Sequence, residues 1–304
     1  MISTIAKNVS SLNLVGDDPI LSGIIDSDHV RLHHPIIDRN VNEDDWKEFS
    51  KIDLNDKVFP YDEQRVKRWI DKAKKDHTDS DLKRSIKSLI RDFSYIWVNS
   101  YYQKRSILIN ESTFTHDILA PILKFIAPSY FKRWTQAQSL SARDRGVLKY
   151  VDVIGNIELK GNLFENFFVE VSHGPFHPNP DQHIVDDNVK LAKLGKDSLD
   201  RNSGTYGDLV LLFHLHAEYI RVYAMDYQFH PVVRKIPLDL IQIPFFSNDP
   251  SFKLINFVKV LFKYRCILEG MWKKYQSINV GNLKRTDVEF RTFNSPKKKQ
   301  TKND

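Results

Sequence analysis

Two carboxylates interrupt otherwise apolar, strand-like segments in the middle of this 304-residue chain: Asp152 lies within 147–155, and Glu170 within 167–172. Because alternate side chains of a strand share a face, each carboxylate is expected among apolar neighbours on a face that is at least half buried. A carboxylate there is costly unless a cation or hydrogen-bond donors compensate it, and two facing carboxylates repel each other. The pattern therefore predicts a divalent-cation site. The alternative is that each acid pairs privately with a nearby Arg or Lys.

Length and composition define the class of protein. With 304 residues and 41% hydrophobic content, the chain can bury a substantial core. The single cysteine, Cys266, excludes an internal disulfide, and the first residues lack a basic stretch followed by an apolar run, so we expect an intracellular protein. The most apolar stretch, 209–225, contains ionisable side chains and is too short and too polar to cross a bilayer, so no membrane role is indicated.

The net charge of +6 is unevenly distributed. Residues 1–60 carry 6 Lys or Arg against 11 Asp or Glu, whereas residues 63–107 carry 12 basic against 6 acidic residues. In a helix predicted from about 80 to 105, Lys83, Lys87 and Arg91 form a stripe separate from the apolar one. A cationic face of this kind favours nucleic acid as a partner, and a merely solvated helix face is the alternative.

The chain divides into four predicted segments. Residues 1–60 are an acidic, partly ordered arm, 61–107 a basic helical segment, 108–283 an α/β domain with a closing C-terminal helix, and 284–304 a basic disordered tail. The run Lys297-Lys-Lys299 in the tail fits a nuclear import signal, although a solvated end explains it almost equally well.

Within 108–283 the hydrophobic pattern predicts a central mixed sheet flanked by helices. We expect a helix over about 111–126 with Glu111 facing inward, a hairpin of strands 147–157 and 164–172, and a helix over 183–200. Strands are then expected at 209–216, 219–227 and 232–236, and a long helix at 252–275. Lys196 lies on the apolar stripe of the 183–200 helix, so it either reaches out to solvent or serves a buried anionic site.

An inward helix Glu, then a strand Asp, then a strand Glu two residues before a polar position resemble the PD-(D/E)XK nuclease-like superfamily over about residues 108–240. The resemblance implies a restriction-endonuclease-like core with an N-terminal helical extension. Asp152 matches the motif aspartate, Glu170 the acid of the (D/E)-X-K strand, and Glu111 the acid often supplied by the first helix. The segments 168–175 and 190–200 are also similar to uncharacterised fungal proteins associated with this fold.

The chain departs from the pattern at Ser172, which stands where the superfamily has lysine. A serine hydroxyl is a poor substitute for an amine that activates water and stabilises transition-state charge. Some members supply the lysine from the neighbouring helix, and here Lys196 is the first candidate and Lys190 the second. The alternative for Lys196 is a cation paired with Asp197 or Asp200.

The resemblance implies a metal-dependent nuclease that hydrolyses phosphodiester bonds of DNA or RNA. Mg²⁺ or Mn²⁺ would be held by Asp152, Glu170, the backbone carbonyl of Val171 and Glu111. Nucleic-acid contacts are expected from Lys83, Lys87, Arg91, Arg143, Arg145 and His173. A catalytically inactive nuclease-fold module that binds nucleic acid or protein is the competing hypothesis, and a zinc site at His173, His177, His183 and Asp186 is a weaker one.

Overall fold

The structure is a computed structural model, and it describes residues 24–27, 43–51, 81–99, 102, 109–173, 181–202, 209–229, 232–246 and 251–277. The elements in chain order are β1 (Ile24–Asp26), α3 (Glu43–Phe49), α6 (Asp81–Val98), α8 (Glu111–Phe114), the π-helical turn η2 (Thr115–Leu119), α9 (Ala120–Ile126), β2 (Phe131–Gln138), α10 (Leu140–Asp144), β3 (Tyr150–Leu159), β4 (Asn162–His173), α11 (Asp181–Asn202), β5 (Val210–His216), β6 (Tyr219–Phe229), β7 (Val232–Gln242) and α12 (Ser251–Gln276).

The strands form one seven-stranded mixed sheet in the order β1-β7-β6-β5-β4-β3-β2. The pairs β4–β5 and β1–β7 are parallel, and the other neighbours are antiparallel. The connection from β4 to its parallel neighbour β5 contains α11, because parallel strands need a crossover. The predicted α/β class with a central mixed sheet and flanking helices is therefore confirmed.

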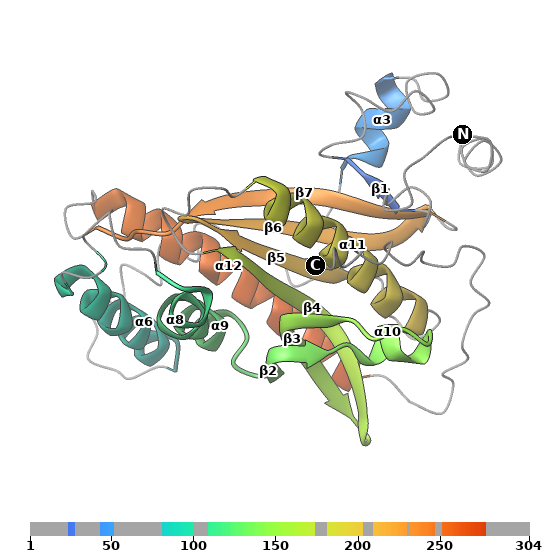
Figure 1. The fold of residues 1–304 in the computed structure, drawn as a ribbon. Helices are drawn as coiled ribbons and strands as arrows, with labels where there is room; N and C mark the ends of the chain where they lie inside the picture. Colours follow the sequence, from blue (N-terminus) through green and yellow to red (C-terminus); the bar gives the residue numbers. More distant parts are fainter. Residues whose placement is uncertain are drawn as a thin grey trace, which may run out of the picture.

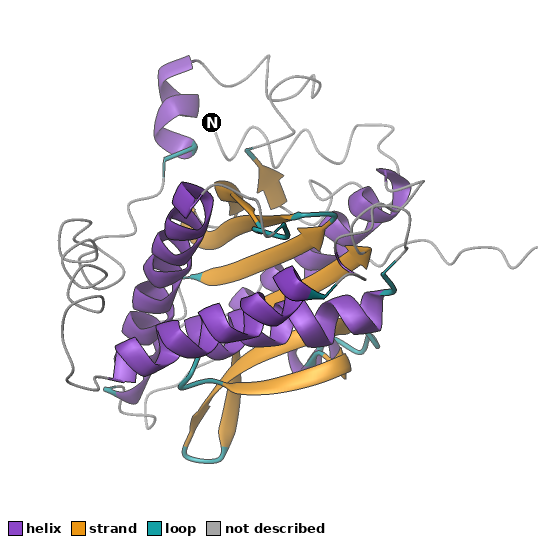
Figure 2. Ribbon diagram, turned by 90° about the vertical axis from the view of Figure 1, so that its left-hand side faces the viewer, coloured by secondary structure: helices purple, strands orange, loops and turns teal. Residues whose placement is uncertain are grey.

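Each face of the sheet carries its own hydrophobic core. Side chains of α6, α8, α9 and α12 pack on one face, and side chains of α10 and α11 pack on the other. Figure 1 shows α11 crossing one face of the strands while α12 runs along the opposite face. The tip of the β3–β4 hairpin extends beyond this body in both views (Figures 1 and 2). Alternate residues of the central strands therefore face two different helical layers.

The predicted hairpin is present; β3 begins and ends two to three residues later than expected, and β4 is longer than expected. It turns at Lys160 and Gly161, which both have positive φ (50° and 78°). β2 was missed, because its sequence, Phe131-Lys-Arg-Trp-Thr-Gln-Ala-Gln138, is mostly polar and lacks the alternation expected of a half-buried strand. As an edge strand with a register shift between Trp134 and Ala137, it needs no such alternation. α6 ends at Val98, before the position predicted for its end.

Part of the acidic arm joins the sheet. Ile24–Asp26 pairs in parallel with β7 and is buried, and the Asp26 carboxylate forms an ion pair with the Lys235 amine at 2.6 Å. The buried Arg234 guanidinium donates to the backbone carbonyl of Phe49, at 2.7 Å. Residues 61–80 of the predicted basic helical segment and the predicted tail 284–304 lie outside the described residues.

The helix from Glu111 to Ile126 is continuous but changes its winding. The π-helical turn Thr115–Leu119 ends just ahead of Pro121, which lies in the first turn of α9 and has no N–H to donate to the preceding turn. Asn110 caps the first turn by accepting a hydrogen bond from the Thr113 N–H at 2.8 Å. This cap and turn fix Glu111 at the N-terminal end of the helix. In the described part of the chain, no helix has the length and apolar character that a membrane span requires.

Candidate carboxylate site

Asp152 and Glu170 meet side by side on the sheet face covered by α11. The register pairs Val153 with Val169 in antiparallel strands, so the next pair along is Asp152 opposite Glu170. Glu170 is buried, with 6% of the residue exposed. The Val171 N–H donates a hydrogen bond to Asp152 Oδ2 at 2.7 Å, which fixes the Asp152 carboxylate against β4.

Glu111 reaches this pair from the end of α8. The residue is exposed at the rim, yet its carboxyl shares a hydrogen bond with Asp152. Partial burial, followed by the charges of Asp152 and Asp187, raises the pKa of Glu111 to about 7. Burial also raises the pKa of Asp152, against the lowering effect of the Val171 N–H. The shared hydrogen bond raises the pKa of Glu111 and lowers that of Asp152, so Glu111 is the donor. The structure therefore brings together the three acids expected from the sequence.

Lys190 supplies a cation to this group from α11. Its amine donates to Glu170 Oε1 and lies 3.5 Å from Asp187 Oδ1. Burial works to lower the pKa of Lys190, but the surrounding carboxylates outweigh it and the pKa is raised, so the amine stays protonated. Asp187 was not predicted from the sequence. The available signal was its position three residues before Lys190, which places both on one helix face.

One ammonium does not balance the site. Burial raises the pKa of Glu170 to about 8 despite the adjacent Lys190, with Asp152 and Asp187 adding repulsion. In the described part of the chain, the second carboxylate oxygen of Glu170, Oε2, is buried without a hydrogen-bond partner. Ionisation of all four carboxyls around one lysine would leave an excess of negative charge, which protons on Glu170 and Glu111 relieve at neutral pH and which an added cation would relieve in their place.

Ser172 connects the carboxylates to a buried histidine. Its hydroxyl donates to Asp187 Oδ2 at 2.7 Å and lies 2.6 Å from His214 Nε2. Because the hydroxyl proton is used for Asp187, His214 Nε2 must be the donor to Ser172, which fixes the neutral tautomer. Burial first, then the neighbouring His216, holds the pKa of His214 well below 6.5. His214 was not predicted as a site residue. The available signal was that it is a polar residue within the otherwise nearly apolar strand segment 209–216.

The first-choice lysine lies elsewhere. Lys196 is fully buried, and its amine donates to Asp200 Oδ2 at 2.6 Å, beside the Tyr227 hydroxyl. Six residues of α-helix turn the chain by about 600°, so Lys196 and Lys190 point about 120° apart around the axis. The expectation that Lys196 joins the acids was therefore wrong, and the alternative pairing with Asp200 is correct. The second candidate, Lys190, occupies the position at the acids.

Some of the side chains expected to contact nucleic acid are exposed at the surface, and others bind groups inside the protein. Lys87, Arg91 and Arg143 are exposed, and the Lys83 side chain lies outside the described residues. Arg145 instead makes two bonds of 2.8 Å to the Asp197 carboxylate, from Nε and Nη2. His173 is buried, with its ring edge toward His216 at 6.5 Å. Arg145 and His173 thus serve the interior, contrary to expectation.

The carboxylate oxygens of the site are the kind of ligand that a hard divalent cation prefers, but they are not arranged as a ready-made metal site. Oxygen donors, excess negative charge and the unpartnered Glu170 Oε2 suit Mg²⁺ or Mn²⁺. Within the described ranges, however, no three His, Cys, Asp or Glu side chains are arranged to hold a metal ion. Ligation through the Val171 carbonyl stays a prediction. Of the suggested zinc ligands, His183 is exposed and His177 lies outside the described residues.

Comparison of the chain with protein-family models found no match. Comparisons with curated proteins and with solved structures found no significant match either.

Proposed function

We propose that this chain is a divergent nuclease-like hydrolase that cleaves phosphodiester bonds of DNA or RNA with Mg²⁺ or Mn²⁺. The observation that carries the proposal is the hydrogen bond from Lys190 to Glu170, beside Asp152 and Glu111. The Lys190 ammonium lies beside the cluster of acids, although Ser172 occupies the position at which the PD-(D/E)XK superfamily has its lysine. Lys190 from the adjacent helix would take the role of the missing strand lysine.

The reaction adds water to phosphorus, breaks the bond from phosphorus to one sugar oxygen, and returns a proton to that oxygen. Asp152, Glu170 and Glu111 would hold the divalent ion, which when bound polarises the phosphoryl group and acidifies a water. The Lys190 ammonium donates hydrogen bonds to the attacking water or to a phosphoryl oxygen as negative charge develops. Asp187 and Ser172 position Lys190 from its other side.

A specific observation favours a second candidate, a catalytically inactive nuclease-fold module. Lys190 already compensates Glu170 Oε1, and no ready three-ligand group exists within the described residues. Such a module would bind nucleic acid through the exposed Lys87 and Arg91 of α6, with salt-sensitive affinity and no cleavage.

The two candidates separate in a cleavage assay on end-labelled single- and double-stranded DNA and RNA, with Mg²⁺, Mn²⁺ or EDTA. We expect products with either ion and none with EDTA. Asp152→Asn and Glu170→Gln should each lower the rate by at least about 100-fold, the scale of losing one electrostatic catalytic group. Glu158→Gln, an exposed carboxylate on the same strand as Asp152, is the matched control and should cleave normally. Cleavage in EDTA, or undiminished cleavage by Asp152→Asn, would refute the proposal.

A further inference from the structure

A segment of the acidic arm lies beside the helix that carries Lys190. Ile24–Asp26 (β1) pairs with residues 233–235 of β7, and Ile24 packs in the same core as buried residues of α11. The Ser27 N–H and hydroxyl both donate to the Lys235 carbonyl, at 2.9 and 3.2 Å. The arm is therefore bound to β7 on the side of the sheet where α11 packs.

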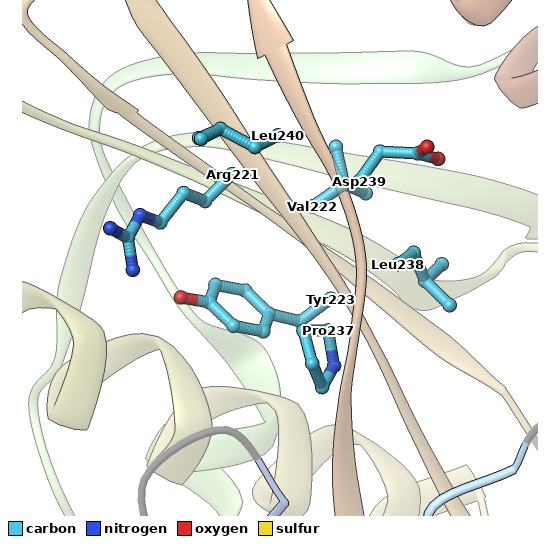
Figure 3. A pocket seen from close by; sticks show the side chains of 7 residues that line it. All are labelled: Arg221, Val222, Tyr223, Pro237, Leu238, Asp239 and Leu240. Atoms are coloured by element: carbon cyan, nitrogen blue, oxygen red, sulfur yellow. The ribbon is translucent and has the colours of Figure 1, made fainter.

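The Lys235 amine binds two elements at once. It is fully buried and donates to the Asp26 carboxylate at 2.6 Å and to the Asn188 side-chain carbonyl at 2.8 Å. It also lies 3.8 Å from the centre of the Tyr223 ring. Figure 3 shows the Tyr223 side chain projecting to the side of the strands opposite the Asp239 carboxylate, which binds a lysine of α12. One ammonium on the α11 face thus joins the arm to α11.

Packing fixes one half of α11 more firmly than the other. Residues 191–199 are buried, whereas residues 183–190 are exposed or half-buried. Asp187, Asn188 and Lys190 lie in the less buried half. Because few apolar contacts hold this half, its position depends more on polar contacts.

Polar contacts to two strands hold the less buried half of α11. Asp187 and Lys190 both bind side chains of β4. Asn188 instead binds Lys235 of β7. Successive residues of an α-helix point about 100° apart, so the Asn188 contact holds the helix from a different side. This contact therefore limits the rotation of α11 at the position where Lys190 reaches the acids.

The Lys235 charge also acts on a side chain of the site. Burial, then His216, then Lys235 hold the pKa of His214 well below 6.5. His214 Nε2 lies 2.6 Å from the Ser172 hydroxyl, and that hydroxyl donates to Asp187. The ammonium that binds the arm is thus close to the groups that hold Asp187 in place.

We propose that Lys235 is a positioning residue for the carboxylate site, and that it couples docking of the arm strand β1 to the place of Lys190. With Asp26 bound, the amine is fixed where it also holds Asn188, and Lys190 stays at Glu170. Without the Asp26 carboxylate the amine loses one of the contacts that fix it, so the less buried half of α11 opens more often. The effect on cleavage rests on the proposed function, whereas the link between the arm and α11 does not.

The first test is hydrogen exchange of the full chain in EDTA, which needs no catalysis. Asp26→Asn should speed exchange of the amides of residues 186–190 by about tenfold, while residues 191–199 keep the wild-type rate. Asn188→Leu should give the same local increase, because it removes the acceptor on the helix. Asp44→Asn, which neutralises a carboxylate that is 96% exposed on α3, is the matched control and should exchange like the wild type.

The double variant Asp26→Asn/Asn188→Leu separates one link through a shared amine from two independent losses. Because both substitutions act on the same ammonium, residues 186–190 should exchange no faster in the double variant than in either single variant. Asp26→Glu keeps a carboxylate and should return the exchange toward the wild-type rate. Thermal melts identify variants that fail to fold, and Asn188→Leu, which keeps the ion pair of Asp26 with Lys235, then carries the test.

The consequence for the proposed reaction is measured separately. Asp26→Asn should lower kcat per folded molecule by about tenfold and leave KM within about twofold, because a displaced Lys190 stabilises the transition state less and no substrate contact is removed. A role in stability alone would leave kcat per folded molecule unchanged.

The inference is overturned if Asp26→Asn leaves residues 186–190 at the wild-type exchange rate, if exchange rises equally along all of α11, or if the two substitutions add. A local increase in Asp26→Asn, together with no metal-dependent cleavage by the wild type, would support the link and refute the enzyme. Cleavage that needs Asp152 but keeps its kcat in Asp26→Asn would support the enzyme and refute the positioning role.

Discussion

The Lys190 amine on α11 donates a hydrogen bond to the Glu170 carboxylate on β4. The contact joins α11, the helix of the β4–α11–β5 crossover, to the strand that precedes it. Lys190 thereby supplies the acids with a cation that Ser172, at the motif position on β4, does not supply. The identity of the lysine therefore becomes the most useful variable for mutation.

We predict that Lys190→Ala lowers metal-dependent cleavage by about 100- to 1,000-fold, because it removes the donor that stabilises developing charge. Initial rates on a labelled substrate, compared with those of Lys190→Arg, provide the measurement. Arginine keeps the charge and should retain a larger share of the rate. Wild-type activity in Lys190→Ala would show that Lys190 takes no part in catalysis.

Lys196→Met should have the opposite profile. It leaves the partly buried Asp200 without its amine, so we expect the free energy of unfolding to fall by about 3 kcal/mol, with the rate per folded molecule unchanged. Urea unfolding and cleavage rates on the same preparation test both parts. A selective loss of rate at full stability would return Lys196 to the catalytic group.

The position of the lysine can be exchanged between strand and helix. Ser172→Lys alone places a second ammonium beside Lys190 and breaks the contacts of Ser172 with Asp187 and His214, so it should destabilise the fold. Combined with Lys190→Ala, the strand lysine has the vacated carboxylates as partners. We expect the double variant to cleave faster than Lys190→Ala; equal or slower cleavage would show that the helix position is irreplaceable.

Histidine protonation should make stability depend on pH. Burial, then Arg221 and His173, lowers the pKa of His216 to about 4, whereas an unfolded histidine titrates near 6.5. Between these values the unfolded chain binds the additional proton, so stability is lost as the pH falls from about 6.5 to 4. His216→Gln should lose less stability than the wild type between pH 7 and pH 5, measured by urea midpoints in EDTA. Identical losses would contradict the assignment.

Close packing between β3 and β4 gives a prediction about the scaffold. A Cβ added at Gly155 would overlap the ring of Phe167, its partner in the register. Gly155→Ala should therefore destabilise the protein by about 1–3 kcal/mol, as overpacking does. Phe167→Leu in the same chain should recover part of this loss, seen as non-additivity in a double-mutant cycle. Additive losses would show that the ring does not limit the space.

Local patterns predicted most of the fold, because the central strands and long helices carry strong apolar periodicity. The hairpin of β3 and β4, the helix α11 and the closing helix α12 all lie close to their predicted limits. β2 and β1 were missed because edge strands need little apolar alternation and because the pairing partner of β1, β7, is far away in the sequence. Such long-range pairing leaves no local signal.

The candidate site was only partly predictable for a related reason. The acids were visible as polar interruptions of apolar strands, but the choice between Lys190 and Lys196 depends on the rotation of α11 over the sheet. An apolar stripe indicates which face packs, and Lys196 packs there in an internal ion pair with Asp200. Lys190 is nearer the helix start, where the face looks onto Glu170.

The most direct test of the central claim is titration of the full chain with Mn²⁺, followed by calorimetry, for the wild type and Asp152→Asn. The account predicts saturable binding of the ion to the wild type and at least tenfold weaker binding to Asp152→Asn, with Glu158→Gln unchanged. Absence of saturable binding at millimolar Mn²⁺, or equal affinity in the wild type and Asp152→Asn, would contradict a cation at the carboxylates.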